Sequence, residues 1–161
     1  MIQEVLPGID AQDTSVLDVG CGTGYQTALL REAGFSQVTG VEIKPHLAQR
    51  ARQLLEDTPG VRIITGDAKK LPARKKFDAI VVGAQTNSIG DVDNLKRRLK
   101  IGGKMMIPIG LKARGLSDAE VKAIRFFQGP YSSAKLMLIT RVGPNKFTQE
   151  DKGTVGFVDL V

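Results

Sequence analysis

Three glycines alternate with single residues directly after an apolar run that begins at Val16. Gly20, Gly22 and Gly24 form a G-x-G-x-G pattern between β-branched residues and an apolar helical pattern. A strand that turns sharply into a helix needs glycine at the bend, because glycine accepts a positive φ. Glycine also lets backbone N–H groups and a helix N-terminus approach a ligand closely. The pattern alone therefore fits both a structural turn and a binding loop.

An acidic residue beside the glycines indicates which ligand the loop suits. A dinucleotide-binding loop carries G-x-G-x-x-G, whereas Tyr25 stands here in place of the third glycine. Asp18, two residues before the first glycine, would repel a pyrophosphate and favour a cationic ligand. S-adenosylmethionine carries an amino group and a sulfonium. The loop is therefore predicted to bind this cofactor and not NAD.

Two further carboxylates follow later predicted strands. Glu42 ends the second strand, where open α/β sheets place the acid that accepts both hydroxyls of a ribose. Asp67 ends the third strand and can accept a hydrogen bond from an adenine amino group. Each acid alone is typical of a turn or a cap. Three acids at the carboxyl ends of the first three strands, beside a glycine loop, predict one shared crevice.

The elements that position these residues alternate along the chain. Apolar runs predict strands over 16–19, 38–43, 61–67, 77–84 and 104–110. Periodic patterns predict helices over 26–33, from Pro45 onward and over 92–99. The helix from Pro45 carries Leu47, Ala51, Leu54 and Leu55 on one face. Strands that are apolar on both faces and separated by helices predict a parallel sheet covered on both sides. The predicted fold is α/β, a Rossmann-like three-layer αβα sandwich.

The pattern changes after Gly110. Ser117 and Glu120 form a capping box, which predicts a helix over 117–127. Residues 134–142 and 154–161 read as strands joined by the turn-rich segment 143–153. These strands are predicted to add an antiparallel pair to the mostly parallel sheet, and residues 1–161 are predicted to form a single domain.

Composition excludes several classes of protein. Among 161 residues, 42% are hydrophobic, and no apolar run approaches the roughly 18 residues that span a bilayer. The first ten residues show no signal-peptide pattern. One cysteine excludes an internal disulfide framework, and a single His46 beside a single Cys21 leaves no metal-ligand cluster. We expect a cytoplasmic protein with no bound metal and no membrane partner, in which Cys21 fills space in the loop.

Positive charge is concentrated in two stretches, 69–76 and 96–104, within a net charge of +6. Such runs are typical of a solvated surface, and they also suit an acidic peptide or a nucleic acid. Two tyrosines and no tryptophan disfavour recognition by base stacking. A nucleic-acid partner is therefore an alternative and not the favoured prediction.

The stretches VLDVGCGTGYQTALL, VTGVEIKPHLAQRA, GDAKKLP, FDAIVVGA and LKIGGKMMIPIG together resemble class I S-adenosylmethionine-dependent methyltransferases. GYQTALL, IPIG and the tail LMLITRV…VGFVDLV narrow this resemblance to the protein-L-isoaspartate O-methyltransferase family. It implies binding of S-adenosyl-L-methionine and its product S-adenosyl-L-homocysteine, with the glycine loop on the methionine moiety, Glu42 on the ribose and Asp67 with Ala68 on the adenine. The implied cofactor residues are Asp18, Gly20, Cys21, Gly22, Thr23, Gly24, Tyr25, Gln26, Glu42, Ile43, Asp67, Ala68 and Gly83.

The predicted reaction is methyl transfer to a carboxylate of a peptide or protein, either an isoaspartyl residue or a C-terminus. A carboxylate is ionised at pH 7 and needs only positioning, with no general base. Gln85, Thr86, Asn87 and Ser88 follow the fourth strand and can orient an acceptor, although an ordinary loop explains them equally well. The alternatives are a nucleic-acid methyltransferase and a cofactor-binding module.

The chain departs from the family pattern at two places. Only fifteen residues precede Val16, whereas the family carries a longer segment there that covers the active site and binds substrate. Residues 111–134 form an insertion whose FFQGPYSS stretch is a candidate replacement wall. We therefore expect the chain to bind cofactor far better than it turns over an isoaspartyl peptide.

Overall fold

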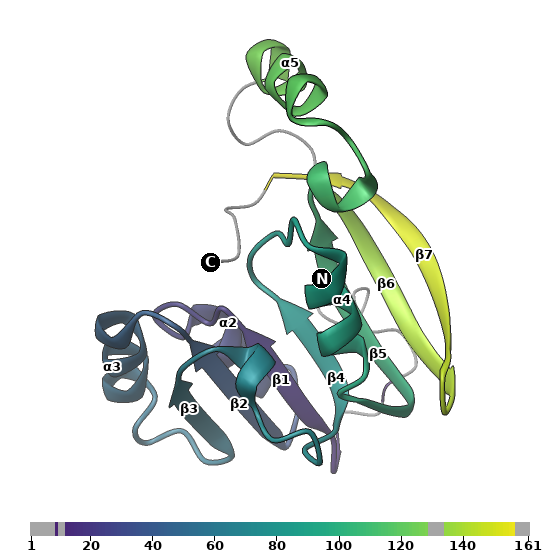
Figure 1. Ribbon diagram of the computed structural model, residues 1–161. Coiled ribbons are helices and arrows are strands. Elements are labelled where there is room, and N and C mark those ends of the chain that lie inside the picture. The colour runs from purple at the N-terminus through teal and green to yellow at the C-terminus, as the bar shows by residue number, and fades with distance from the viewer. Residues whose placement is uncertain (1–8, 10–11, 129–133, 157–161) are drawn as a thin grey trace.

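The computed structural model describes residues 9, 12–128 and 134–156 of the chain. These residues build a seven-stranded sheet with the order β3-β2-β1-β4-β5-β6-β7 (Figure 1). The strands are β1 (Ser15–Val19), β2 (Gln37–Glu42), β3 (Val61–Thr65), β4 (Phe77–Val82), β5 (Leu99–Ile109), β6 (Ala134–Gly143) and β7 (Lys146–Val155). Strands β1 to β5 pair in parallel, and β6 and β7 form the antiparallel pair. The predicted sheet composition is confirmed.

Helices cover both faces of the sheet. They are α2 (Tyr25–Glu32), α3 (Pro45–Leu54), α4 (Ile89–Lys96) and α5 (Asp118–Gln128), with short 3-10 helices η1 (Ala68–Lys70) and η2 (Lys112–Arg114). Successive strand residues point to opposite faces, so Val16 packs with Leu30 of α2 while Leu17 packs with Leu95 of α4. All four of these side chains are fully buried, which is why the inner strands carry apolar residues on both faces. The three-layer αβα prediction is confirmed.

The topology creates a crevice at the carboxyl ends of the central strands. The chain moves outward from β1 to β2 and β3, then returns to the opposite side of β1 as β4. The segments after β1 and β4 therefore diverge above the carboxyl ends of the strands. Ligands of open α/β sheets bind at such a switch point.

Two predicted boundaries around α4 and β5 are wrong. The helix spans Ile89–Lys96 and not 92–99, because Ser88 caps its N-terminus, where its hydroxyl accepts a hydrogen bond from Asp91 N at 3.4 Å. Strand β5 begins at Leu99 and not at residue 104, because the glycine pair after Ile101 forms an irregularity within the strand and does not end it.

The second strand of the C-terminal pair also differs from its prediction. Strand β7 starts at Lys146, eight residues before the predicted start at Thr154, because a tight turn at Pro144 and Asn145 closes the hairpin. Its residues are mostly exposed and polar, as expected of an edge strand, so no apolar run in the sequence marks it as a strand. Residues 157–161 of the predicted strand lie outside the described residues.

Helix α3 buries a smaller set of side chains than its sequence pattern predicts. Its buried residues are Ala48 and Ala51, whereas Leu54 is 55% exposed. The small alanine side chains at the contact let the helix pack closely against β2 and β3.

Helix α5 forms where the capping box predicts it. The Ser117 hydroxyl donates to the Glu120 carboxylate at 2.6 Å, and Ser117 N donates to the same carboxylate at 2.8 Å. Residues 129–133 of the FFQGPYSS stretch lie outside the described residues. Within the part of the chain that the structure describes, no helix is long and apolar enough to cross a membrane.

Candidate functional site

The glycine loop between β1 and α2 wraps over the end of β2. Gly20 N and Cys21 N donate hydrogen bonds to Val41 O at 2.8 and 3.2 Å. Gly20, Gly22 and Gly24 have φ values of 74°, 56° and 92°, which L side chains adopt at a cost. A Cβ added to Gly22 would meet no atom within 4 Å, so backbone conformation alone requires glycine there. The predicted positive φ at the bend is confirmed.

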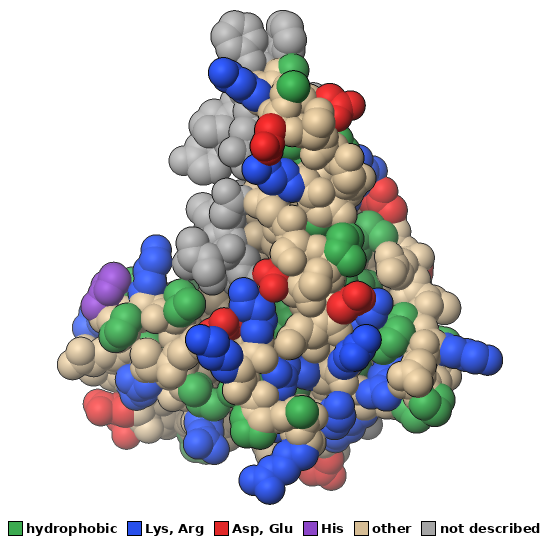
Figure 2. Space-filling view, in the orientation of Figure 1, with side chains coloured by type: hydrophobic (Ala, Val, Ile, Leu, Met, Phe, Trp, Pro, Cys, Tyr) green, Lys and Arg blue, Asp and Glu red, His purple; other side chains and the backbone are tan. Residues whose placement is uncertain are grey.

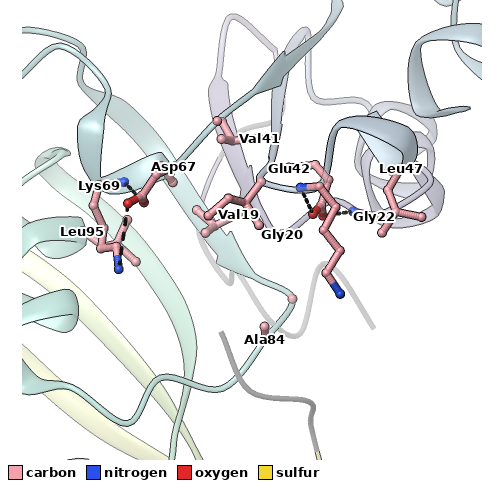
Figure 3. Close-up of a pocket in the computed structure, with 15 residues that line it drawn as sticks. Val19, Gly20, Gly22, Val41, Glu42, Leu47, Asp67, Lys69, Ala84 and Leu95 are labelled. Atoms are coloured by element: carbon pink, nitrogen blue, oxygen red, sulfur yellow. Dashed lines mark hydrogen bonds and ion pairs between the residues drawn. The ribbon is translucent and has the colours of Figure 1, made fainter. Parts of the chain in front are cut away.

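Glu42 lies at the carboxyl end of β2, and its side chain is only 6% exposed. One carboxylate oxygen accepts a hydrogen bond from Gly22 N at 2.9 Å, and the other accepts one from Lys44 N at 2.9 Å. These bonds fix the carboxylate beside the glycine loop, as the dashed lines in Figure 3 show. Each oxygen keeps a second lone pair with which it can accept a bond from a ligand.

Asp67 lies on the opposite side of the same cleft, beyond Val19 and Val41 (Figure 3). Its carboxylate accepts a hydrogen bond from Lys69 N at 2.9 Å and caps η1. The Lys69 amine is 4.0 Å from Asp67 and 3.5 Å from Asp91, so it joins the cleft to the start of α4.

A cleft of about 200 Å³ runs between these two acids. Of the predicted cofactor residues, seven line it: Gly20, Gly22, Glu42, Ile43, Asp67, Ala68 and Gly83. The structure thus brings together residues from the ends of β1, β2, β3 and β4, which are separated by up to 63 positions in the sequence.

Eight further residues line the cleft and were not among the predicted ones: Val19, Val41, Lys44, Leu47, Gly66, Lys69, Ala84 and Leu95. Most are neighbours of the predicted residues along a strand or loop, and their adjacency was the available signal. Leu95 is different, because it reaches the cleft from the far end of α4. Only the packing of that helix against the sheet brings it there.

Asp18 lies beneath the loop and does not line the cleft. It is fully buried, where it accepts hydrogen bonds from the Thr27 hydroxyl at 2.6 Å and the Gln26 amide at 3.2 Å. Burial raises the pKa of Asp18 to about 7, the Thr27 bond lowers it, and the negative charge of Glu42 raises it further. Asp18 therefore ties the loop to the first turn of α2 from below.

The remaining predicted loop residues also lie off the cleft wall. Burial, followed by the charges of Asp18 and Glu42, raises the pKa of the Cys21 thiol to about 12, so this thiol is protonated at neutral pH. Thr23 is exposed, and Tyr25 is 75% exposed at the start of α2. Gly24 is buried against α3, and Gln26 is bonded to Asp18.

The predicted acceptor segment forms a compact loop between β4 and α4. Thr86 is fully buried and pairs with the end of β5, because its N–H donates to Pro108 O at 2.9 Å and its carbonyl accepts from Gly110 N at 2.7 Å. Ser88 N donates to the Thr86 hydroxyl at 3.2 Å. These contacts hold the loop in one shape. Asn87 lies against Gly110, and a Cβ added to Gly110 would collide with the Oδ1 of Asn87. Gln85 is also buried.

Metal ligands do not gather in the described part of the chain. No group of three His, Cys, Asp or Glu side chains there is arranged to hold a metal ion. His46, at the start of α3, is exposed.

Comparisons with known proteins agree with this geometry. Residues 16–103 match the family model described as a methyltransferase domain. A protein-L-isoaspartate O-methyltransferase of Brucella anthropi is 34% identical over 149 residues, which are 91% of this chain and 59% of that protein. One from Anaeromyxobacter dehalogenans is 44% identical over 108 residues, covering 64% of this chain and 49% of the relative.

Solved structures show the same fold. A protein-L-isoaspartate O-methyltransferase superposes with a TM-score of 0.76 at 21% identity, covering 99% of this chain and 45% of that one. One from Plasmodium falciparum, in complex with S-adenosyl-L-homocysteine, superposes with a TM-score of 0.70 at 22% identity, covering 99% of this chain and 69% of that one. This chain spans 59% of the length of the Brucella relative. The family match extends over more than half of the chain and includes the glycine loop, Glu42 and Asp67, so this chain belongs to the methyltransferase domain family.

Proposed function

We propose that the cleft binds S-adenosylmethionine and that the protein transfers its methyl group to a carboxylate of a peptide or protein. The observation that carries this proposal is the Glu42 carboxylate, held beside the glycine loop by two backbone N–H groups. The similarity to protein-L-isoaspartate O-methyltransferases over 91% of the chain supports a carboxylate acceptor.

The residues of the cleft fit this cofactor. Glu42 offers two buried carboxylate oxygens to a ribose diol, and Asp67 offers one to an exocyclic amine. The open space beside Gly22 accommodates a ligand against the backbone. The buried carboxylate of Glu42 also makes the loop region electronegative, which favours an amino group and a sulfonium.

The bound cofactor supplies an electrophilic methyl group on its sulfonium. A carboxylate acceptor is already ionised at neutral pH, so the protein has only to orient it and exclude water. We assign the orienting role to the loop formed by Gln85, Thr86, Asn87 and Ser88. The contacts of Thr86 and Ser88 within the loop suit them to hold its shape, and the partly exposed Asn87 suits contact with the acceptor.

A binding measurement tests the cofactor site. Glu42→Ala removes two charged acceptors, each worth roughly 1.5–3 kcal/mol in a hydrogen bond to the ribose, so the affinity for S-adenosylmethionine should fall by at least about a hundredfold. Lys44→Ala is the matched control, because Lys44 lines the same wall of the cleft but offers no acceptor from its side chain. Calorimetry that finds equal losses in both variants, or none in Glu42→Ala, contradicts the assignment.

A product analysis tests the acceptor. Transfer to an isoaspartyl peptide gives an ester that releases methanol in mild base, whereas methylated nucleic acid does not. Methylation of the peptide is the expected result. The basic stretches favour a second candidate, nucleic-acid methylation, and methyl groups that are stable to base on RNA or DNA would establish it instead.

A further inference from the structure

Two basic stretches that are about twenty residues apart form one surface. The Lys76 amine donates to Arg97 O at 2.8 Å. Arg98 is only 5% exposed, and its guanidinium donates to Lys69 O at 2.7 Å and to Pro72 O at 3.2 Å. Arg98 therefore fixes the segment after η1 against the end of α4.

We call this surface the basic face. Figure 2 shows Lys and Arg side chains gathered on it, over the side of the sheet that carries η1 and α4. It consists of the following cations of the two stretches: Lys70, Arg74, Lys75, Lys76, Lys96, Arg97 and Lys100.

Most of this positive charge is uncompensated. Lys96 pairs with Asp93 at 2.5 Å, and Lys100 pairs with Asp78 at 2.8 Å. The described residues offer no ion pair to the other five cations of the basic face. The folded chain therefore presents an excess of positive charge here, which attracts anions.

The surroundings of Lys75 disfavour its charged form. Burial lowers the pKa of its amine, and the nearby charge of Arg62 lowers it further. The Lys75 amine also lies 5.4 Å from the centre of the Phe77 ring.

A groove lies within the basic face, with a volume of about 460 Å³. Its lining residues are Ala73, Lys76, Gly90, Asp93, Asn94, Arg97 and Arg98. Three of them are cations and one is an acid, and that acid is already paired with Lys96. The charge of the groove thus suits an anionic segment.

Helix α4 connects this groove to the loop that we assign to the acceptor. The helix begins directly after Ser88 and ends at Lys96, with Arg97 as its C-terminal cap. Its eight residues rise about 12 Å. An extended peptide covers about 3.3 Å per residue, so roughly four residues span that length.

We propose that the basic face and its groove bind an acidic stretch of the protein substrate, about four to six residues from the methylated carboxylate. This inference rests on the proposed function. An acidic peptide suits the surface better than a nucleic acid does, because the nearby aromatic rings of the described residues are not free for stacking. Phe77 is buried, and Phe147 lies under Lys96 and Arg141 at 5.0 and 5.9 Å.

The test uses two isoaspartyl peptides that carry either three Asp or three Asn residues at positions four to six from the isoaspartyl residue. Fluorescence anisotropy measures their binding without turnover. The acidic peptide should bind about tenfold more tightly at low salt, and this preference should fade as salt is added. Equal binding of both peptides overturns the proposal.

Charge reversal locates the site. K76E combined with R97E should abolish the preference and leave binding of the neutral peptide unchanged. K122E combined with K146E is the control, because it changes the net charge by the same amount at residues on α5 and on the β6–β7 hairpin. This control variant should retain the preference for the acidic peptide. D93N removes the acid from the groove and should strengthen the preference. A preference lost in both double variants indicates a net-charge effect and overturns the proposal, as does one retained in K76E/R97E.

Failure of the inference is distinguishable from failure of the proposed function. If both peptides are methylated equally well, the inference is wrong and the function stands. If neither peptide is methylated but the acidic one binds through Lys76 and Arg97, the function is wrong and the acidic docking surface stands. A single-stranded oligonucleotide that binds the same residues more tightly than the acidic peptide would reassign the surface to nucleic acid and overturn the proposal.

Discussion

At the residue scale, two buried carboxylates beside the glycine loop have different surroundings. Glu42 accepts bonds from two backbone N–H groups and faces the cleft. Asp18 accepts bonds from the side chains of Thr27 and Gln26 and is closed off from water and from the cleft. Burial dominates at Asp18 and raises its pKa to about 7. Glu42 is thus suited to contact a ligand, and Asp18 is suited to support the loop.

This difference predicts a pH-dependent effect of Asp18→Asn. The folded pKa of Asp18 is raised from 3.8 to about 7, so its favourable contribution is complete below about pH 3.8 and is lost as pH rises through about 7. Asn stays neutral and can still accept the Thr27 bond if the Gln26 amide turns its oxygen toward it. The melting temperature of the variant minus that of the wild type should therefore be larger at pH 8 than at pH 5.

Because both proteins share all other titratable groups, subtracting one melting temperature from the other removes the pH dependence that those groups cause. A difference that stays constant from pH 5 to pH 8 would show that Asp18 is ionised throughout and that burial does not control its charge.

At the element scale, the glycine loop packs closely against α3 at Gly24. Gly24 has a φ of 92° and caps α2. A Cβ there would lie 2.7 Å from Leu55 Cδ1 and 3.2 Å from Ala51 Cβ. The loop, α2 and α3 therefore meet at a point where only glycine fits.

Gly24→Ala should destabilise the fold through both backbone strain and crowding, by about 2–4 kcal/mol. Gly115→Ala is the matched control, because Gly115 has a φ of 85° but no atom within 4 Å of its added Cβ. Strain alone should cost about 1 kcal/mol there. Chemical denaturation of both variants measures the difference, and equal losses would show that α3 yields to the added methyl group.

At the scale of the whole molecule, the two ends of the strands have separate roles. The carboxyl edge holds the cleft. At the amino edge, Asp78 of β4 accepts hydrogen bonds from Ser15 N at 2.9 Å and from its hydroxyl at 2.7 Å, and pairs with Lys100 at 2.8 Å. This one carboxylate joins β1, β4 and β5, and it contacts none of the residues that line the cleft.

Asp78→Asn should lower stability at neutral pH by about 1–2 kcal/mol and leave cofactor affinity unchanged. Burial acts to raise the pKa of Asp78, but the bonds from Lys100 and Ser15 outweigh it and lower the pKa below 3.8. The stabilisation is therefore present above about pH 3.8 and is lost as pH falls through the folded pKa.

The measurement for Asp78 is chemical denaturation at a series of pH values. The difference in the free energy of unfolding between wild type and variant should disappear as the pH is lowered. Asp151→Asn is the control, because it breaks an exposed pair with Lys135 on the edge hairpin and should leave the unfolding midpoint unchanged. A reduced cofactor affinity in Asp78→Asn would show that the two edges are coupled.

Local patterns were sufficient to predict the parallel core of the fold and the positions of the candidate acids. Each buried strand is a short apolar run, and parallel strands bring their carboxyl ends to one edge, so Glu42 and Asp67 were expected to lie near the loop. The start of strand β7 could not be predicted in this way, because an exposed edge strand has no apolar face in its sequence.

The sequence determined the bend, because positive φ at Gly20, Gly22 and Gly24 is a local property of the backbone. It also determined which acids follow which strands. Only the tertiary structure decided that Asp18 turns beneath the loop, that Leu95 reaches the cleft and that Arg98 joins two distant basic stretches. These outcomes depend on which face of a strand or helix another element covers. That is a property of packing between distant segments and not of any one segment.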